Sequence, residues 1–239
     1  MNYLHEKTFL ADIALRLARK YENKLEQLKQ EYRELERPDF IWHFLLQSFS
    51  TMGRAAGWHG LIGNKENYAK LTFETLKQMS PSRRERIVRS TCHAAKVRMP
   101  DKKADFILGC FDYIQTLGGL QAANKVLHSA HGRDGKIKFL MTFPGIGPKY
   151  ARNIMMDVYH EDFRESIAID VRIKAISSAL GLSFNNYADH ENFYLESARL
   201  AGLNGWEMDR LLFHFRGEIE IEIAAAGKPI VPPAGIDCS

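Results

Sequence analysis

The chain has 239 residues, and its 33 Lys and Arg residues outnumber its 29 Asp and Glu residues to give a formal net charge of +4. A hydrophobic content of 45% with 26% charged residues is typical of a folded protein, so wholesale disorder is excluded and one large domain or two closely packed lobes are expected. No apolar run approaches the roughly 18 residues that a membrane span requires, and no secretory signal opens the sequence, so we expect a cytoplasmic protein.

The first third of the chain is predicted to be helical. Residues 3–37 contain neither Gly nor Pro, and their apolar side chains recur at helical spacing, which predicts an amphipathic helix with one break near Glu22–Asn23. Such a helix can form a coiled-coil dimer, but packing against the chain's own core is the favoured interpretation. Pro38 is a start signal for a second helix with an apolar body over Phe40–Phe49. Four glycines at positions 53, 57, 60 and 63 then predict a loop.

The rest of the chain continues the helical pattern. No stretch alternates apolar and polar residues over any length, so little or no sheet is expected. Three prolines in the tail 227–233 exclude a helix there. Further helices are predicted over residues 66–78, 82–97, 101–117, 119–130, 135–141, 148–159, 168–180, 190–201 and 205–225.

Charge and cysteine placement narrow the function classes. Residues 51–150 carry a net charge of +10, whereas residues 151–239 carry −6. A basic middle suits a polyanion such as DNA or RNA, although a solvated Arg-rich surface would look the same. Cys92, Cys110 and Cys238 are too few for a four-cysteine metal or iron–sulfur site, and they do not resemble a secreted disulfide framework.

The most informative segment spans residues 138–179. Phe143-Pro144-Gly145-Ile146-Gly147 separates two predicted helices, and Pro148 opens the second at a position where its missing N–H costs nothing. Two glycines around one apolar residue allow a hairpin with outward-facing amides, which can bind a phosphate at the helix N-terminus. Tyr150 excludes both a dinucleotide fingerprint and a P-loop, because it stands where the first needs Gly and the second needs Ser or Thr. Taken alone, the segment could still be a plain helix–helix turn.

The wider sequence resembles the helix-hairpin-helix DNA glycosylases, the superfamily of endonuclease III and the 8-oxoguanine DNA glycosylases. Residues 143–149 (FPGIGPK) match the family's hairpin, and residues 167–173 (IAIDVRI) match its apolar-Asp element at a slightly longer spacing. Residues 103–107 (KADFI) and 206–216 (WEMDRLLFHFR) look like two further family helices. The likeness covers roughly residues 38–220, and its specificity lies in 139–173. The four-cysteine cluster of endonuclease III is absent, which resembles the cluster-free 8-oxoguanine branches.

The resemblance implies two catalytic residues. Cleavage of an N-glycosidic bond builds positive charge on the sugar, which a carboxylate stabilises, and a neutral lysine can attack C1′ to form a Schiff base. Carried over from the family, Lys149 is the nucleophile and Asp170 the electrostatic stabiliser and proton shuttle. Two simpler interpretations stay open. Lys149 could bind phosphate in a non-catalytic module, and Asp170 could be a helix N-cap.

The resemblance also implies residues that bind DNA and the extracted base, since family enzymes flip the damaged nucleotide into a pocket. A wedge or pocket is expected from the end of the second helix, although core packing is favoured for the two aromatic residues there. These candidates are Trp42, Gln47, Phe49 and Met52. The expected contacts to the DNA backbone are Gly145, Ile146, Gly147, Lys136, Lys138, Arg152 and Arg172.

Together these features predict an all-α protein of two helical lobes with an active-site cleft between them. Residues 38–160 would carry the hairpin, and residues 1–37 and 161–239 would form the second lobe with Asp170. The expected partner is double-stranded DNA with a damaged base, bound by a monomer that needs no cofactor or metal and is nucleoid-associated if the source is prokaryotic.

The implied activity is removal of an oxidised purine such as 8-oxoguanine, followed by strand cleavage at the abasic site. The alternatives are a glycosylase for an oxidised pyrimidine, uracil or an alkylated purine, a non-catalytic DNA-binding module, and an all-α interaction protein that uses its N-terminal helix.

Overall fold

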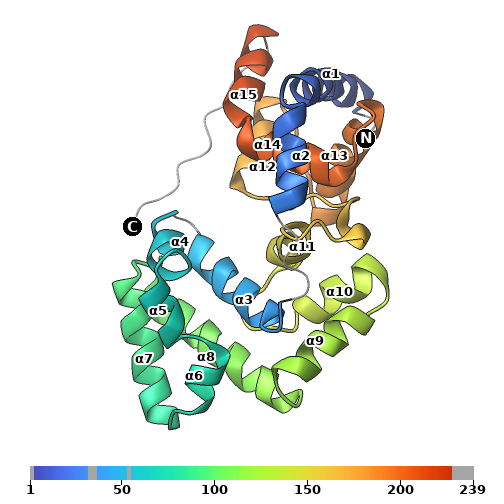
Figure 1. Ribbon diagram of the computed structural model, residues 1–239. Helices are drawn as coiled ribbons and strands as arrows, with labels where there is room; N and C mark the ends of the chain where they lie inside the picture. Colours follow the sequence, from blue (N-terminus) through green and yellow to red (C-terminus); the bar gives the residue numbers. More distant parts are fainter. Residues whose placement is uncertain (1–2, 32–36, 53–54, 228–239) are drawn as a thin grey trace. The chain divides into compact units, whose positions relative to one another are not determined.

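The computed structural model describes residues 3–31, 37–52 and 55–227, and every regular element in these ranges is a helix. The chain divides into two compact units, one formed by residues 1–33 and 155–239 and the other by residues 34–154. Figure 1 labels the helices of each unit. None of the described helices is long and apolar enough to span a membrane.

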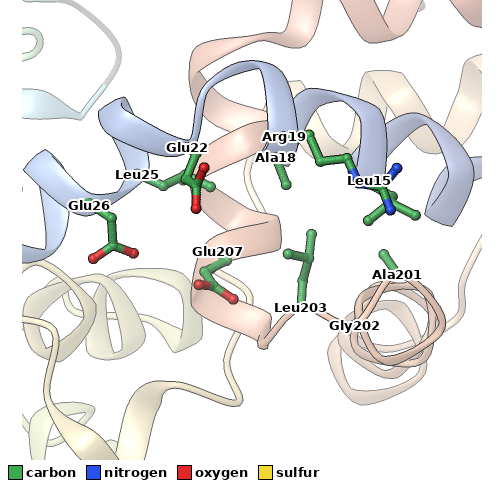
Figure 2. Close-up of a pocket in the computed structure, with 10 residues that line it drawn as sticks. All are labelled: Leu15, Ala18, Arg19, Glu22, Leu25, Glu26, Ala201, Gly202, Leu203 and Glu207. Atoms are coloured by element: carbon green, nitrogen blue, oxygen red, sulfur yellow. The ribbon is translucent and has the colours of Figure 1, made fainter.

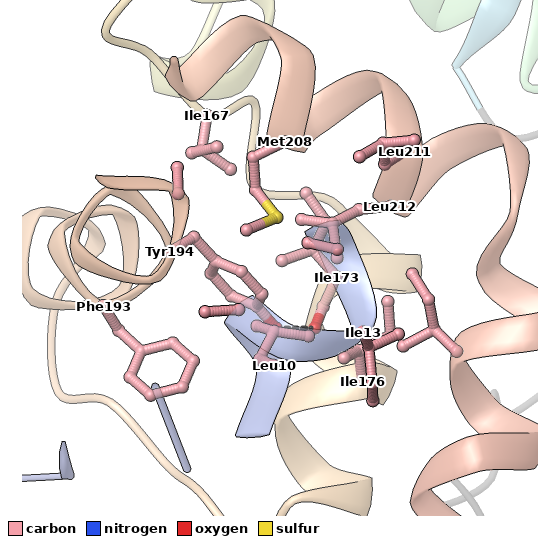
Figure 3. Close-up of a cluster of buried hydrophobic side chains, with 14 of the residues drawn as sticks. Leu10, Ile13, Ile167, Ile173, Ile176, Phe193, Tyr194, Met208, Leu211 and Leu212 are labelled. Carbon is pink, nitrogen blue, oxygen red and sulfur yellow. Dashed lines mark hydrogen bonds between the residues drawn. The ribbon is translucent and has the colours of Figure 1, made fainter. Parts of the chain in front are cut away.

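The first unit is formed by both ends of the chain. Its long helices are α1 (Leu4–Lys20), α2 (Glu22–Glu31), α12 (Val171–Ala179), α13 (Tyr187–Leu200), α14 (Gly205–His214) and α15 (Arg216–Ala225), with a short 3₁₀ turn at Glu161–Phe163. The apolar stripe of α1 packs against α13 and α14, and Figure 3 shows Leu10 and Ile13 in the same core as Tyr194. The ring of Tyr21 stacks on Phe215 with 3.8 Å between centroids, which ties the N-terminal helices to α15. The N-terminal helix therefore belongs to the chain's own core, as predicted.

The second unit contains α3 (Phe40–Thr51), α4 (Ala55–Leu61), α5 (Lys65–Lys70), α6 (Phe73–Lys77), α7 (Pro81–Ala94), α8 (Pro100–Thr116), α9 (Leu120–Ser129) and α10 (Gly132–Leu140). Its core is aromatic, because Trp42 packs edge-on against Phe73 and Phe111. The Trp42 indole also donates a hydrogen bond of 2.7 Å to the carbonyl of Leu71. Helix α11 (Pro148–Met156) carries the chain from this unit into the other.

In the glycine-rich segment after α3, residues 55–61 form helix α4 with Gly57 and Gly60 inside it, so the loop prediction was wrong for these residues. A Cβ on Gly57 would lie 2.4 Å from the Ser50 carbonyl oxygen, and one on Gly60 would lie 2.1 Å from that of Ala95. These glycines allow α4 to approach neighbouring backbone closely. The pattern was read as turn chemistry, whereas its cause is helix packing.

Two predicted helices are each divided. Residues 66–78 form α5 and α6, because Thr72 caps a new helix by accepting a hydrogen bond from the Thr75 amide. Residues 205–225 form α14 and α15, which separate at Phe215 (φ −117°) where the ring stacks on Tyr21. The single break predicted near Glu22–Asn23 lies at Tyr21. The predicted non-helical tail falls almost wholly outside the described residues.

The division between the units lies before residue 155, whereas the sequence placed it after residue 160. Residues 155–160 belong with the first unit because Trp206 holds them. Its indole donates to the Met156 carbonyl at 2.7 Å, and its ring packs against Tyr159 with 4.6 Å between centroids.

Candidate functional site

The hairpin between α10 and α11 is a tight turn closed by its own backbone. The Ile146 amide donates to the Phe143 carbonyl at 3.1 Å, and Gly145 adopts φ +81°, which favours glycine. The Gly147 carbonyl accepts from the Ala151 amide and so begins α11 behind Pro148. Ile146 is buried at 5% exposure, so it anchors the turn while Gly145 lies at the surface.

Side chains of helix α8 pack against this turn, a contact that the sequence did not predict. The Phe106 ring lies under Gly145, where an added Cβ would approach it to 2.5 Å. The Cys110 thiol donates to the Pro144 carbonyl at 3.5 Å, and Tyr113 packs edge-on against Phe143. Phe106, which lies in the segment matched to the family's KADFI helix, thus forms the seat of the hairpin together with Cys110 and Tyr113 of the same helix. This contact between α8 and the hairpin is visible only in the three-dimensional structure.

Lys149 is the second residue of α11 and is half-buried. Its Nζ lies 4.0 Å from the centroid of the Tyr150 ring. The ring face attracts a cation, so this contact orients the Lys149 amine over the Tyr150 ring. The arrangement keeps an amine at the start of a helix that follows an exposed glycine turn.

Asp170 caps the N-terminus of α12 through one oxygen. Its Oδ1 accepts from the amides of Arg172 at 2.8 Å and Ile173 at 3.0 Å. Its Oδ2 accepts no hydrogen bond from the described residues, and the side chain is half-exposed. The N-cap interpretation is therefore confirmed, and it leaves one carboxylate oxygen uncommitted.

The expected DNA contacts differ in accessibility. Lys138 is exposed on α10. Lys136 and Arg152 are only 5% and 8% exposed, and they donate to the carbonyls of Ala130 and Pro148 respectively. We therefore correct the expectation for these two, because their cationic groups are buried against the protein's own backbone. Arg172 is half-buried, with its guanidinium 4.3 Å from the Phe213 ring centroid.

The four candidates for a base wedge or pocket also differ in accessibility, since two are buried and two are half-exposed. Trp42 and Phe49 are each 1% exposed within the core of the second unit, so neither can contact a base, and the packing interpretation holds. Gln47 and Met52 are half-exposed near the C-terminal end of α3. Met52 receives a buried amine, since Lys103 Nζ lies 2.6 Å from its sulfur.

The first unit also has a hollow of about 300 Å³ between the α1–α2 break and the turn after α13. Figure 2 shows Leu25 and Leu203 on its walls with Glu22, Glu26 and Glu207 around it. Lys29 links Glu26 and Glu207 at 2.6 and 2.8 Å. None of the predicted site residues lines this hollow, and its carboxylates would repel a nucleic acid.

Comparison with solved structures shows the fold. The 8-oxoguanine DNA glycosylase of Methanocaldococcus jannaschii superposes with a TM-score of 0.66 at 13% identity, covering 91% of this chain and 98% of that one. The 8-oxoguanine DNA glycosylase of Thermotoga maritima gives 0.63 at 14% identity, covering 86% and 95%. The Methanocaldococcus jannaschii 8-oxoguanine glycosylase/lyase in complex with a 15mer DNA containing 8-oxoguanine also gives 0.63, at 13% identity, covering 86% and 96%.

The chain therefore has the all-α fold of the helix-hairpin-helix 8-oxoguanine DNA glycosylases, as its sequence predicted. No protein-family model and no curated protein sequence matches the chain.

Proposed function

We propose that this chain is a DNA glycosylase that removes an oxidised purine, with 8-oxoguanine the first choice, and then cleaves the strand at the abasic site. The observation that carries the proposal is the coincidence of this fold with a lysine at the second position of the post-hairpin helix and an aspartate with one uncommitted oxygen. The named activities of the structural neighbours support the choice of lesion.

Each residue has a defined chemical part in the proposed reaction. The neutral Lys149 amine attacks C1′, the bond to the base breaks with its electron pair leaving on the base, and a proton neutralises the departing base. The attached nitrogen then gives a proton to solvent while the ring oxygen takes one up, so the sugar ring opens to a Schiff base. Loss of a C2′ proton then breaks the C3′–O bond, with the phosphate as leaving group. The carboxylate of Asp170 stabilises the positive charge that develops on the sugar.

The proposal is tested by borohydride reduction during incubation with duplexes that contain 8-oxoguanine or an abasic site. The wild-type chain should form a covalent adduct that Lys149→Gln cannot form. Lys138→Gln is the matched control, because it removes an exposed lysine from the other helix of the hairpin. At protein concentrations that saturate the DNA, it should trap as much adduct as wild type. A duplex panel with oxidised pyrimidine, uracil and alkylated purine identifies the lesion.

Two results would count against this function. An undiminished adduct with Lys149→Gln would remove the proposed nucleophile. DNA binding without any adduct or base release from every duplex would favour the non-catalytic module.

A further inference from the structure

The irregular segment Ser166–Ile169, which leads directly into Asp170, is held by side chains from two other helices. Glu191 Oε1 accepts from the Ile167 amide at 3.1 Å, and Asp209 Oδ1 accepts from the Ala168 amide at 2.8 Å. The Tyr187 hydroxyl accepts from the Ile169 amide at 2.9 Å and donates to the Ile167 carbonyl at 2.8 Å. Three consecutive amides therefore have side-chain oxygens as acceptors.

This clamp, meaning Tyr187, Glu191 and Asp209, consists of a half-buried tyrosine and two buried carboxylates from two helices. Tyr187 and Glu191 lie four residues apart on one face of α13, and Asp209 comes from α14. Glu191 and Asp209 are 3% and 4% exposed. Burying carboxylates is costly unless amides or cations compensate them, and here backbone amides do so.

Ion pairs connect Asp209 of the clamp to Arg210 and, through it, to Asp157. Arg210 lies 3.8 Å from Asp209 and donates to Asp157 at 3.1 Å, and both Arg210 and Asp157 are buried. The guanidinium lies beside the Asp209 carboxylate and compensates its charge, and Asp209 Oδ1 accepts from the Ala168 amide. Apolar side chains could pack an ordinary buried loop at lower cost, so this polar arrangement points to precise placement of the backbone.

The residue placed by this backbone is Asp170. The clamp fixes the three residues before it, and Oδ1 is fixed by the two amides after it. The direction of Oδ2 is then set from both sides. We infer that Tyr187, Glu191 and Asp209 are positioning residues that aim the uncommitted oxygen of Asp170 at the reacting sugar. This inference rests on the proposed function, because it assigns that oxygen its target.

Tyr187→Phe is the sharpest test because it removes one hydroxyl, and with it two hydrogen bonds to the segment, while keeping the ring. We expect the single-turnover rate of base release to fall about tenfold, because misplacement of a stabilising charge lowers the chemical step. The Kd for lesion DNA should stay within twofold. Tyr21→Phe is the matched control, since its hydroxyl bonds to Glu218 in the same unit and does not contact the clamp. It should match the wild-type rate.

Hydrogen exchange gives a readout that does not depend on activity. If the clamp aims Asp170, Tyr187→Phe should accelerate exchange of the Arg172 and Ile173 amides, which Oδ1 caps, while Tyr21→Phe leaves them unchanged. A wild-type chain without base release would overturn the proposed function, while faster exchange in Tyr187→Phe would still support the clamp's hold on Asp170.

Two outcomes would overturn the inference itself. One is that the wild-type chain releases the base and Tyr187→Phe releases it at the same rate. The other is unchanged exchange of the two capped amides. If Tyr187→Phe does not fold, the pair Glu191→Gln and Glu191→Met replaces it. The amide oxygen of Gln still accepts from Ile167, so Gln should keep the rate and the exchange pattern, and Met should lose both.

Discussion

At the scale of single residues, Asp170 combines two tasks that the sequence presented as alternatives. One oxygen caps α12, and the other makes no hydrogen bond within the described chain. The two amides that Oδ1 caps fix the direction of the carboxylate at the start of α12. The structural task therefore orients the group for the proposed chemical one.

Substitutions at Asp170 should separate these tasks. Asp170→Asn keeps a capping oxygen and loses the charge, so the free energy of unfolding should stay within about 0.5 kcal/mol of wild type. Its rate of base release should fall about 100-fold, the usual loss of one electrostatic stabiliser. Asp170→Ala should lose the same activity and, in addition, about 1 kcal/mol of stability. Urea unfolding measures the stability of each variant, and single-turnover assays measure its rate of base release. Equal activity in Asp170→Asn and wild type would leave the residue as a cap only.

The environment of Lys103 is unfavourable for its positive charge. It is 8% exposed in the first turn of α8, and its contacts within the described chain are the Met52 sulfur and the Phe106 ring. Burial, with help from Lys102 and Arg98, lowers the pKa of this amine. Lys103→Met should therefore raise the free energy of unfolding by about 1 kcal/mol. Lys102→Met, an exposed neighbour, should change it little, and a destabilised Lys103→Met would contradict this account.

His190 should make stability depend on pH. Burial, with a smaller effect of Lys174, lowers the pKa of His190 to about 4, and its Nε2 lies 2.7 Å from the Ser177 hydroxyl. The fold favours neutral imidazole, so this stability is complete above the unfolded pKa of about 6.5 and is lost as pH falls toward 4. The slope is at most about 1.4 kcal/mol per pH unit. His190→Gln should flatten urea-measured stability between pH 6.5 and 5, and an unchanged slope would exclude His190 as its source.

At the scale of helices and turns, the sequence predicted which segments are helical better than where they end or why their glycines are there. Hydrophobic spacing and Pro148 located the hairpin correctly, since those signals are local. The function of Gly57 and Gly60 could not be read from the sequence, because it depends on carbonyls of distant residues. The seat of the hairpin on Phe106 is likewise a contact between segments far apart in the chain.

Gly145 and Gly147 should respond differently to alanine. Gly145→Ala meets both a left-handed backbone (φ +81°) and the Phe106 ring at 2.5 Å, whereas a Cβ on Gly147 meets nothing within 4 Å. We expect Gly145→Ala to cost about 2–3 kcal/mol of unfolding free energy, with loss of DNA binding as the turn is displaced. Gly147→Ala should cost less than about 1 kcal/mol. Thermal unfolding and DNA binding assays compare the two, and equal stability would show that the turn adapts.

At the scale of the whole molecule, charge follows the division into units. Residues 34–154 contain 19 basic and 10 acidic residues, and the remainder contains 14 and 19. The sequence thus places most of the positive charge in residues 34–154, and DNA binding by this unit stays a prediction. It could not predict which cations are available, because Lys136 and Arg152 differ from Lys138 in burial and not in type.

The salt dependence of DNA affinity should reveal this difference. Each phosphate neutralised by a protein cation releases condensed counterions, so the logarithm of the association constant should fall steeply with the logarithm of salt concentration. Lys138→Gln should make that slope shallower by about 1, the loss of one phosphate contact. Lys24→Gln, which removes a lysine from α2 in the acidic unit, should leave it unchanged. Fluorescence anisotropy between 50 and 200 mM salt, a range where about ten contacts change affinity by orders of magnitude, provides the measurement. Equal slopes for all three chains would place the phosphate contacts on other cations, and a flat wild-type response would favour an interaction protein over a DNA-binding one.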